Sequence, residues 1–149
     1  MTQFQPLDPD FEQKVRDSFF RQPFMIFIGS RMDKLLPGVC EISVPRREEL
    51  TQQHGYFHAG VTGTLADDAC GYAAFSLSAP NSSVLTVEYK LNLLSPAKGE
   101  RLVARAEVLK SGRTLKICKA DVFACTGGQE TLCATALATI MILENRADQ

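Results

Sequence analysis

The chain has 149 residues, 45% of them apolar and 22% charged, and its formal net charge is -1. This length and composition predict one soluble globular domain with a substantial core. The near-neutral charge argues against a nucleic-acid binder, which would carry a strongly basic face, but it leaves acidic substrates open because a few local cations can hold a phosphate.

The N-terminal segment MTQFQPLDPDFEQK is polar and acidic, so we expect no secretory signal there. The longest apolar stretches fall far short of the roughly 20 residues that a membrane span requires, so we expect no membrane insertion. The cysteines form no CxxC pair, and their odd number favours reduced thiols in a cytoplasmic protein. They are Cys40, Cys70, Cys118, Cys125 and Cys133.

Helical signals come first along the chain. Asp8-Pro9 predicts an N-cap followed by proline at the first helical position. Apolar residues recur at every fourth position from Phe11 to Phe19, which predicts a helix over about 9–21 that covers the core.

The next stretch is less regular. Residues 24–36 fit a short helix and a short strand equally well. Pro37-Gly38 predicts a turn, and Val39–Val44 alternates as a strand should. The segment TQQHGYFHAG that begins at Thr51 has no period, so we expect an irregular connection there.

A helix over about 60–77 is apolar nearly all round, which predicts that it is buried. Each interior glycine costs about 1 kcal/mol relative to alanine, so we expect a sheet to approach the helix backbone closely in compensation. The small residues of this helix are Gly63, Ala66, Ala69, Gly71, Ala73 and Ala74.

Strand-like runs follow at about 83–94, 101–110, 114–125 and 131–143, joined by the short turns SPAKGE, SGR and TGGQE. Such connections favour an antiparallel sheet. The middle two runs alternate, so one of their faces meets solvent or a partner, whereas the last is apolar nearly throughout and is expected to be more central. The chain therefore predicts an α+β domain whose sheet wraps around one helix.

Titratable residues gather at the entry to the buried helix and inside it. His54 and His58 precede the helix, which then carries Asp67 and Asp68 among apolar neighbours. Successive helical residues point about 100° apart, so at most one of these carboxylates should face a given cleft. A buried acid is costly unless it is paired or used, so two interpretations stay open. In the first, one carboxylate makes a structural salt bridge or hydrogen bond and the other is solvated; in the second, one of them is functional.

Other chemistries lack their motifs. His54 and His58 stand at i and i+4, but no third His or Cys is spaced to complete a metal site, so we expect no metal. Neither a GxSxG elbow nor a Cys with a distant His partner is present. No glycine-rich phosphate loop follows a strand, so we expect no nucleotide cofactor.

The stretch QQHGYFHAGVTGTLADDACGYAA, residues 52–74, resembles the signature of hotdog-fold thioesterases of the phenylacetic-acid-degradation (PaaI-like) type. In that signature an Asn or Gln precedes a His-Gly-Gly, and Leu-x-Asp follows nine residues after the His. The run VLTVEYKLNLLSPAKGERLVARAEVLKSGRT is also similar, and the likeness covers about 24–143. It implies one hotdog domain over 1–149, with 1–23 as an N-terminal helical extension and an antiparallel sheet around a long central helix.

The resemblance implies a catalytic role for five residues. Asp67 matches the catalytic carboxylate, which acts as general base or nucleophile, and Ala59 stands where the family has a glycine whose N–H polarises the thioester carbonyl. Gln52 is expected near the carbonyl or the attacking water. His58 is the signature His at the helix entry, and Thr86 is expected near the reaction centre.

Four further residues are candidates for binding substrate: Gly60, which keeps the second signature glycine, Asp68, Lys98 and Arg113. For the CoA phosphates we favour Arg113, in the Gly-Arg-Thr turn, over the other cations of the strand turns, which include Arg101 and Lys110. The departure at Ala59 keeps the N–H but adds a methyl group and would make a positive φ costly.

The chemistry requires two chains. A helix N-terminus stabilises the oxyanion of an acyl transfer, and Ala59 lies there. Asp67 is eight residues further on, about 12 Å along the helix, whereas a base must come within about 3 Å of its target. Two chains with antiparallel helices can bring Ala59 of one to Asp67 of the other. The resemblance implies the same shared-site homodimer, within a pair of dimers.

We therefore expect an acyl-CoA thioesterase. The alternative is a non-catalytic acyl-CoA- or lipid-binding hotdog module in which Ala59 has blunted the oxyanion site. A hotdog dehydratase or hydratase fits less well, because its His and carboxylate come in a different motif order. The acyl group stays open, since the small residues and phenylalanines could line either an aryl or an aliphatic pocket.

Overall fold

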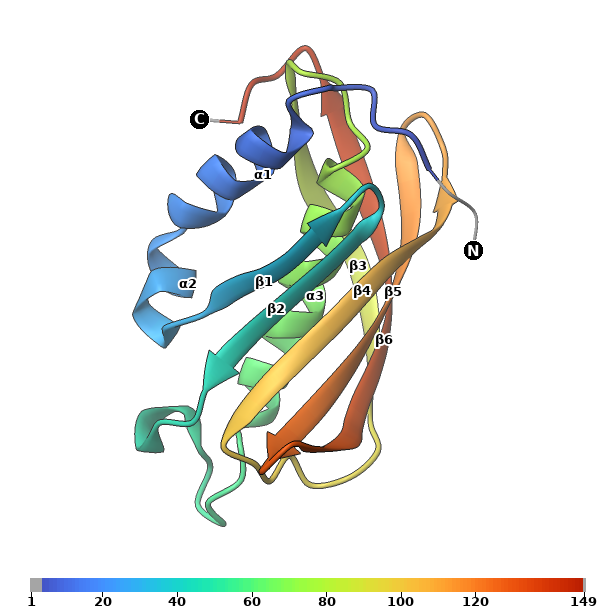
Figure 1. Ribbon diagram of the computed structural model, residues 1–149. Helices are drawn as coiled ribbons and strands as arrows, with labels where there is room; N and C mark the ends of the chain where they lie inside the picture. The colour runs from blue at the N-terminus through green and yellow to red at the C-terminus, as the bar shows by residue number, and fades with distance from the viewer. Residues whose placement is uncertain (1–3, 149) are drawn as a thin grey trace.

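The structure is a computed structural model and describes residues 4–148. Two short helices come first, α1 (Phe11–Phe20) and α2 (Pro23–Ile28), and the long helix α3 (Ala59–Phe75) follows a 3₁₀ turn at Glu48–Leu50 (Figure 1). The strands are β1 (Arg31–Leu36), β2 (Val39–Pro45), β3 (Ser82–Leu93), β4 (Arg101–Ser111), β5 (Leu115–Thr126) and β6 (Gln129–Glu144).

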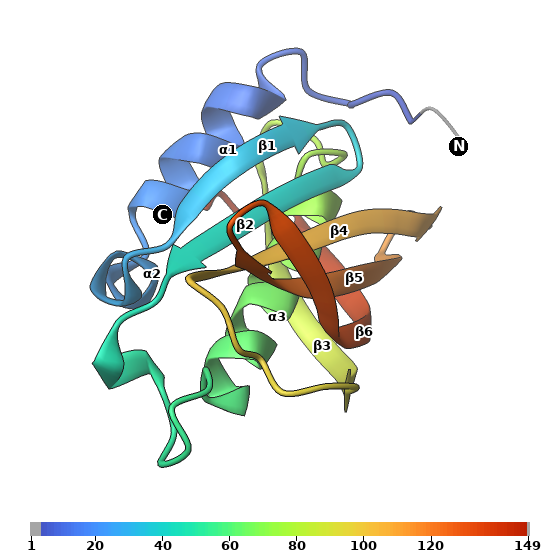
Figure 2. The ribbon, with the colours of Figure 1, turned by 60° about the horizontal axis from the view of Figure 1, so that its bottom comes forward.

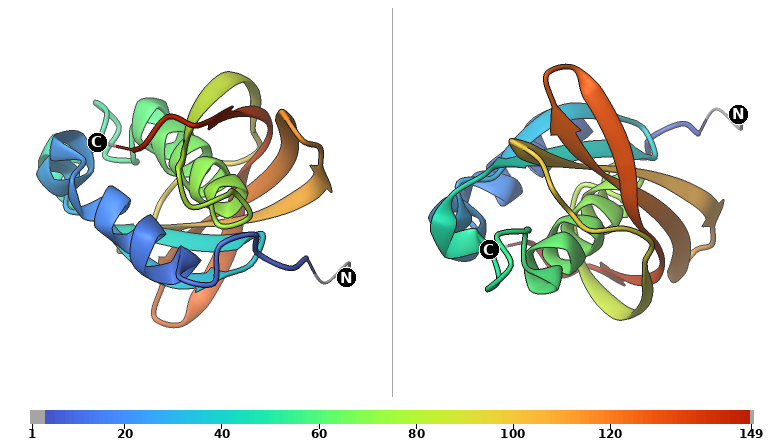
Figure 3. Two further views of the ribbon diagram at one scale, coloured as in Figure 1. Left: turned by 90° about the horizontal axis from the view of Figure 1, so that it is seen from above. Right: turned by 90° about the horizontal axis from the view of Figure 1, so that it is seen from below.

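All six strands form one antiparallel sheet in the order β1-β2-β4-β5-β6-β3. The sheet curves around α3, which lies in its hollow, while α1 and α2 lie beyond β1 (Figures 2 and 3). This is the α+β arrangement that the sequence predicts. One edge of the sheet is β1 and the other is β3.

Small side chains on α3 let the sheet close around it. Ala66, Ala69, Ala73 and Ala74 are fully buried. At Gly63 a Cβ atom would lie 3.3 Å from the Tyr89 hydroxyl and 3.5 Å from Leu91 Cδ2, so β3 does approach the helix there. The same explanation is wrong at Gly71, where nothing lies within 4 Å of an added Cβ.

Strand β3 carries one extra residue. Thr86 pairs with Ile140 and Glu88 with Thr139, so Val87 forms a bulge against β6. A bulge shifts the alternation of side chains by one position. Thr86 therefore faces α3 before the bulge, and Tyr89 faces it afterwards.

The start of α1 differs from the prediction. Asp8 is not the N-cap; its side chain accepts a hydrogen bond from the Asp10 N–H (2.9 Å) and pairs with Lys14 (3.0 Å). The helix begins at Phe11, after Asp10, and Pro9 lies outside it. The bond from the Asp10 N–H to Asp8 is of the kind that an N-cap makes, but the Phe11 N–H donates to the Asp8 carbonyl (3.2 Å) in a tighter turn, and the helix begins only after it.

The ambiguous segment 24–36 contains both elements. Gly29, in the left-handed region at φ 76°, ends α2 and allows the chain to turn into β1.

The expectation of a central last strand is wrong: β6 lies next to the edge strand β3, and its burial alternates. Its apolar composition reflects an outer face that is also apolar, where Leu137 is 52% exposed.

Every cysteine in the described residues is a free, buried thiol. Within residues 4–148, no helix is long and apolar enough to span a membrane. Residues 1–3 and 149, which the expected domain and its N-terminal extension include, lie outside the described residues.

Candidate active site

His58 sets the start of the central helix. It is the N-cap of α3, and its Nδ1 accepts a hydrogen bond from the Gly60 N–H at 2.9 Å. Its own N–H donates to the Leu50 carbonyl (2.9 Å), which fixes the preceding loop. A Cβ on Gly60 would lie 3.0 Å from this imidazole nitrogen, so the signature glycine makes room for the cap.

Ala59 occupies the first position of α3. Its backbone has no positive φ, because Asn145 is the one non-glycine residue with positive φ in the described chain. The strain expected from replacing glycine is therefore absent: a helical N1 residue needs no left-handed conformation. Ala59 is exposed, and its N–H has no hydrogen-bond acceptor among residues 4–148. It is a free donor at the positive end of a helix.

Gln52 lies in a tight loop before α3. Its N–H donates to the Tyr56 carbonyl (2.9 Å), and its side-chain oxygen accepts from the His54 N–H. Gln52, His58 and Ala59 line one cavity of about 580 Å³. Its remaining walls come from the end of β3 and the loop after it, including Leu93, Leu94, Pro96 and Ala97.

Asp67 lies two turns further along α3 and meets β3. The Thr86 hydroxyl donates a 2.8 Å hydrogen bond to Asp67 Oδ1, so the structure brings these two predicted residues together. Burial raises the pKa of the half-buried Asp67 carboxyl above its ordinary value, and the bond from Thr86 opposes that rise. A desolvated carboxylate is more basic than one in water.

Asp68 lines the same cavity as Asp67, one of about 290 Å³, which corrects the expectation that the two would face different clefts. The cavity extends around α3 from Thr86 on β3 to Ser18 on α1, far enough to take in both side chains. Gln22 donates to Asp68 Oδ1 at 3.0 Å, while Oδ2 is buried without a partner in the described residues. Burial raises the pKa of Asp68 to about 7.

The polar partners of Asp68 could not be found from the sequence. The Gln22 amide also donates to the Tyr72 hydroxyl (2.8 Å), which is 3.1 Å from the Ser18 hydroxyl. Ser18 and Gln22 belong to the N-terminal helical extension, which carries no motif. Only Tyr72, one turn after Asp68, had a helical spacing that could indicate the contact.

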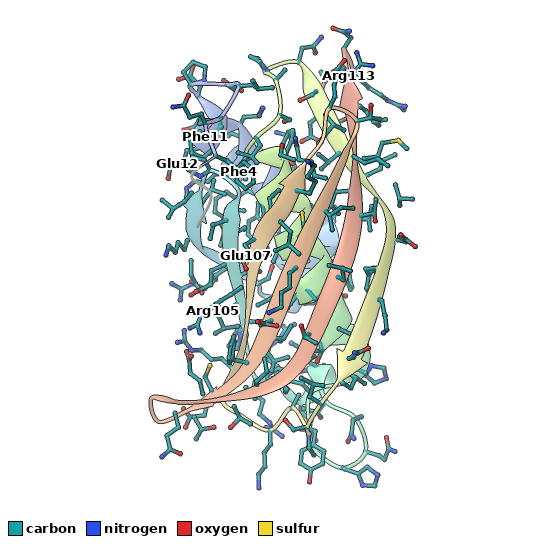
Figure 4. All side chains as sticks on the ribbon, turned by 90° about the vertical axis from the view of Figure 1, so that its right-hand side faces the viewer. Phe4, Phe11, Glu12, Arg105, Glu107 and Arg113 are labelled. Carbon is teal, nitrogen blue, oxygen red and sulfur yellow. The ribbon has the colours of Figure 1, made fainter. Side chains whose placement is uncertain are left out.

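The two basic candidates lie at opposite ends of the molecule. Lys98 is exposed in the loop whose residues Pro96 and Ala97 line the Ala59 cavity. Arg113 lines a cavity with Leu77, beyond the C-terminal end of α3 (Figure 4). Within one chain, Arg113 is therefore not brought to the Ala59 cavity.

Ala59 and Asp67 line different cavities of the chain. Eight residues of helix separate them, which is about 12 Å. Among residues 4–148, no group of three or more His, Cys, Asp or Glu side chains could hold a metal ion. The arrangement offers two halves of an acyl-transfer site, an amide donor and a desolvated carboxylate, on separate parts of one helix.

Comparisons with known proteins identify the family and support the fold. Residues 54–131 match the Thioesterase superfamily. A crystal structure of a thioesterase family protein from Silicibacter pomeroyi is 54% identical, with a TM-score of 0.88 over 90% of this chain and 98% of that one. Acyl-coenzyme A thioesterase 13 of Homo sapiens is 36% identical over 85 residues, which are 56% of this chain and 59% of that protein.

A phenylacetic acid degradation-related protein from Ralstonia eutropha, 22% identical, has a TM-score of 0.75 over 88% of this chain and 98% of that one. This chain spans less than two thirds of the human relative. These likenesses confirm the expected hotdog architecture, a six-stranded antiparallel sheet around one long helix.

Proposed function

We propose, from the premise that this chain belongs to the thioesterase superfamily and is a thioester hydrolase, that it converts acyl-CoA thioesters to the free acid and CoA at a site shared by two subunits. One observation carries the proposal. The free amide of Ala59 and the desolvated carboxyl of Asp67 belong to one helix but line separate cavities.

Each half has a defined role in this proposal. The Ala59 N–H, at a helix N-terminus, stabilises the negative charge that develops on the thioester oxygen. Asp67 either takes a proton from the water that attacks the carbonyl, or attacks the carbonyl itself to form a mixed anhydride that water then hydrolyses to the free acid. In both cases the carbon–sulfur bond breaks and CoA leaves as the thiolate, which takes up the proton released from water. Thr86 holds the carboxylate in place, and Gln52 orients the carbonyl or the water.

An exposed edge of the sheet supports the shared site. In strand β3 the side chains of Leu85, Val87, Tyr89 and Leu93 are 59%, 54%, 45% and 58% exposed. A long apolar edge strand is a template for pairing with another chain. A second copy paired there about a twofold axis has its α3 antiparallel to the first, with Asp67 of the partner subunit facing Ala59.

Surface features support the remaining parts of the proposal. The exposed Leu137 on the outer face of the sheet supports association of two dimers. Lys98, beside the Ala59 cavity, is the cation placed to meet the CoA phosphates, and Arg113 of a neighbouring subunit is the second. Five buried free thiols support a cytoplasmic location.

Two substitutions test the two halves. We expect Asp67→Asn to lower kcat by at least ~100-fold. Ala59→Pro removes the donor, and proline suits the first helical position. The preceding residue, His58, already has the extended backbone (φ -62°, ψ 140°) that precedes a proline. We expect a loss of about 100-fold in kcat with the fold retained, measured by release of CoA and by circular dichroism.

Mixing the two inactive variants distinguishes a shared site from two separate ones. A mixed dimer has one intact centre, made of Ala59 from the Asp67→Asn chain and Asp67 from the Ala59→Pro chain. Random reassociation should restore about a quarter of the wild-type activity, because about half of the dimers are mixed and each has one good site of two. No recovery would contradict the shared site. Tight binding of acyl-CoA without turnover, unchanged by Asp67→Asn, would instead support a binding module.

A further inference from the structure

Two exposed phenylalanines stand beside the entry of the central helix. Phe24 and Phe27 of α2 are 57% and 69% exposed. Exposed apolar side chains that cluster mark surfaces for a ligand or a partner. Their helix is held firmly, because Met25 and Ile28 are buried beneath it and the Arg47 guanidinium donates to the Phe27 carbonyl at 2.7 Å.

Phe24 and Phe27 form one wall of a groove of about 420 Å³. This volume is within the range of about 300–1,000 Å³ typical of small-molecule sites. The opposite wall is the first turns of α3, with Val61 and Thr64. The Thr64 hydroxyl donates to the Gly60 carbonyl (2.8 Å), so it is already satisfied within the helix. The groove is therefore mostly apolar.

The groove reaches the proposed reaction centre. His58 and Gly60, the residues on either side of Ala59, both line it. His58 also lines the 580 Å³ cavity that holds Gln52 and Ala59. The free amide of Ala59 thus lies between the groove and the 580 Å³ cavity. A thioester whose carbonyl is bound to this amide can extend its acyl group into one of them and its CoA into the other.

The charged residues around the two cavities indicate which one receives the CoA phosphates and which one the acyl group. Among the described residues that line the Phe24–Phe27 groove, the one charged side chain is Glu49, which repels phosphate. The other cavity is bordered by the loop that carries the exposed Lys98 and by the loop before His58, where the Arg46 guanidinium donates to the Gly55 carbonyl (3.3 Å). Arg47, the cation beside the groove, is bound to the Phe27 carbonyl and does not line the groove. The phosphate-bearing CoA therefore suits the cavity lined by Gln52 and Ala59, and the groove is left for the uncharged, apolar acyl group.

We propose that the groove between α2 and α3 holds the acyl group, and that Phe24 and Phe27 make the enzyme selective for medium- and long-chain acyl-CoA. This inference rests on the proposed thioester hydrolysis. Short acyl groups end near the Ala59 amide and do not reach the two phenyl rings, so the rings affect long substrates alone.

The test compares kcat/KM of the full-length protein for lauroyl-CoA and acetyl-CoA. In Phe24→Ala, Phe27→Ala and the double variant, we expect the lauroyl-CoA value to fall by about tenfold or more while the acetyl-CoA value stays within about twofold. Ile26→Ala is the matched control, because Ile26 belongs to the same helix and is 61% exposed but does not line the groove. It should change neither value.

The possible outcomes separate the two proposals. Equal losses for both substrates, no loss for either, or a loss for phenylacetyl-CoA with lauroyl-CoA unaffected would overturn the acyl groove while leaving thioester hydrolysis intact. A wild-type protein that hydrolyses no acyl-CoA would overturn both. Calorimetry with the stable thioether S-dodecyl-CoA gives a readout independent of turnover: the phenylalanine variants should bind it about tenfold more weakly than Ile26→Ala does, and equal binding would count against the groove.

Discussion

Asp67 and Asp68 are neighbours in the sequence and share one cavity, yet their surroundings differ. Asp67 is half-buried and held by a hydroxyl donor on the edge strand. Asp68 is held by an amide from the N-terminal helices and has one buried oxygen without a partner in the described chain. The sequence identified both acids and assigned catalysis to Asp67 through its place in the signature, but the environment of Asp68 depends on residues far away in the chain.

Thr86 should control the pH dependence of turnover. Its hydrogen bond lowers the pKa of Asp67 against the rise caused by burial. Thr86→Val removes the donor, so the pKa should rise further, and the acid limb of the kcat/KM profile should move to higher pH by about one unit. Thr86→Ser should restore the wild-type profile. An unchanged acid limb in Thr86→Val would show that Asp67 is not the group that titrates.

Asp68 should make the protein less stable as the pH rises. The unfolded chain ionises this carboxyl near its ordinary pKa of 3.8, whereas burial raises the folded pKa to about 7. Unfolding therefore releases a proton between these values, and the free energy of unfolding falls as the pH rises through this window. Asp68→Asn keeps an acceptor for Gln22 and avoids the buried charge.

We expect Asp68→Asn to stabilise the protein at pH 8 by roughly 2–4 kcal/mol, with the gain shrinking toward pH 4. Urea unfolding of both proteins across this pH range measures the difference. A constant difference at every pH would contradict the assignment of the titration to Asp68.

At the level of elements, periodicity predicted most of the fold. The buried helix, the four long strands and the strand at Val39 lie within about two residues of their predicted bounds, because each has a clear period or a flanking turn. The segment 24–36 could not be divided, since the left-handed turn at Gly29 depends on the packing of Met25 and Ile28, which both precede it in α2. The same limit hid the groove of Phe24 and Phe27.

We expect the main role of His58 to be that of N-cap for α3, with any role in the reaction secondary. His58→Ala removes the acceptor of the Gly60 N–H, which should lower the free energy of unfolding by about 1 kcal/mol. Asparagine is a good N-cap, so His58→Asn should regain most of that stability. Chemical denaturation of the three proteins measures both effects. If His58→Asn recovers stability and turnover together, the imidazole acts through the cap alone.

At the scale of the whole molecule, the β3 edge should decide whether the enzyme works. Leu85→Lys puts a charge on this edge, which should block pairing of chains. We expect monomers by light scattering and loss of turnover, since a lone chain cannot bring its own Ala59 and Asp67 together. Leu137→Lys, on the outer face, is the comparison and should keep both the dimer and its activity. A monomeric Leu85→Lys protein with full turnover would refute the shared site.

The single extra residue in β3 fixes which contacts the inner side of that strand can make. Because Val87 stands outside the pairing with β6, even-numbered positions before it and odd-numbered positions after it share the inner face. Deleting Val87 would straighten the strand and force one half to rotate. Either Thr86 would lose Asp67, or Tyr89 and Leu91 would leave the space above Gly63. The Thr86–Asp67 contact of the proposed reaction centre and the close packing against Gly63 thus both depend on the one extra residue of β3. Deleting that residue would remove one contact or the other.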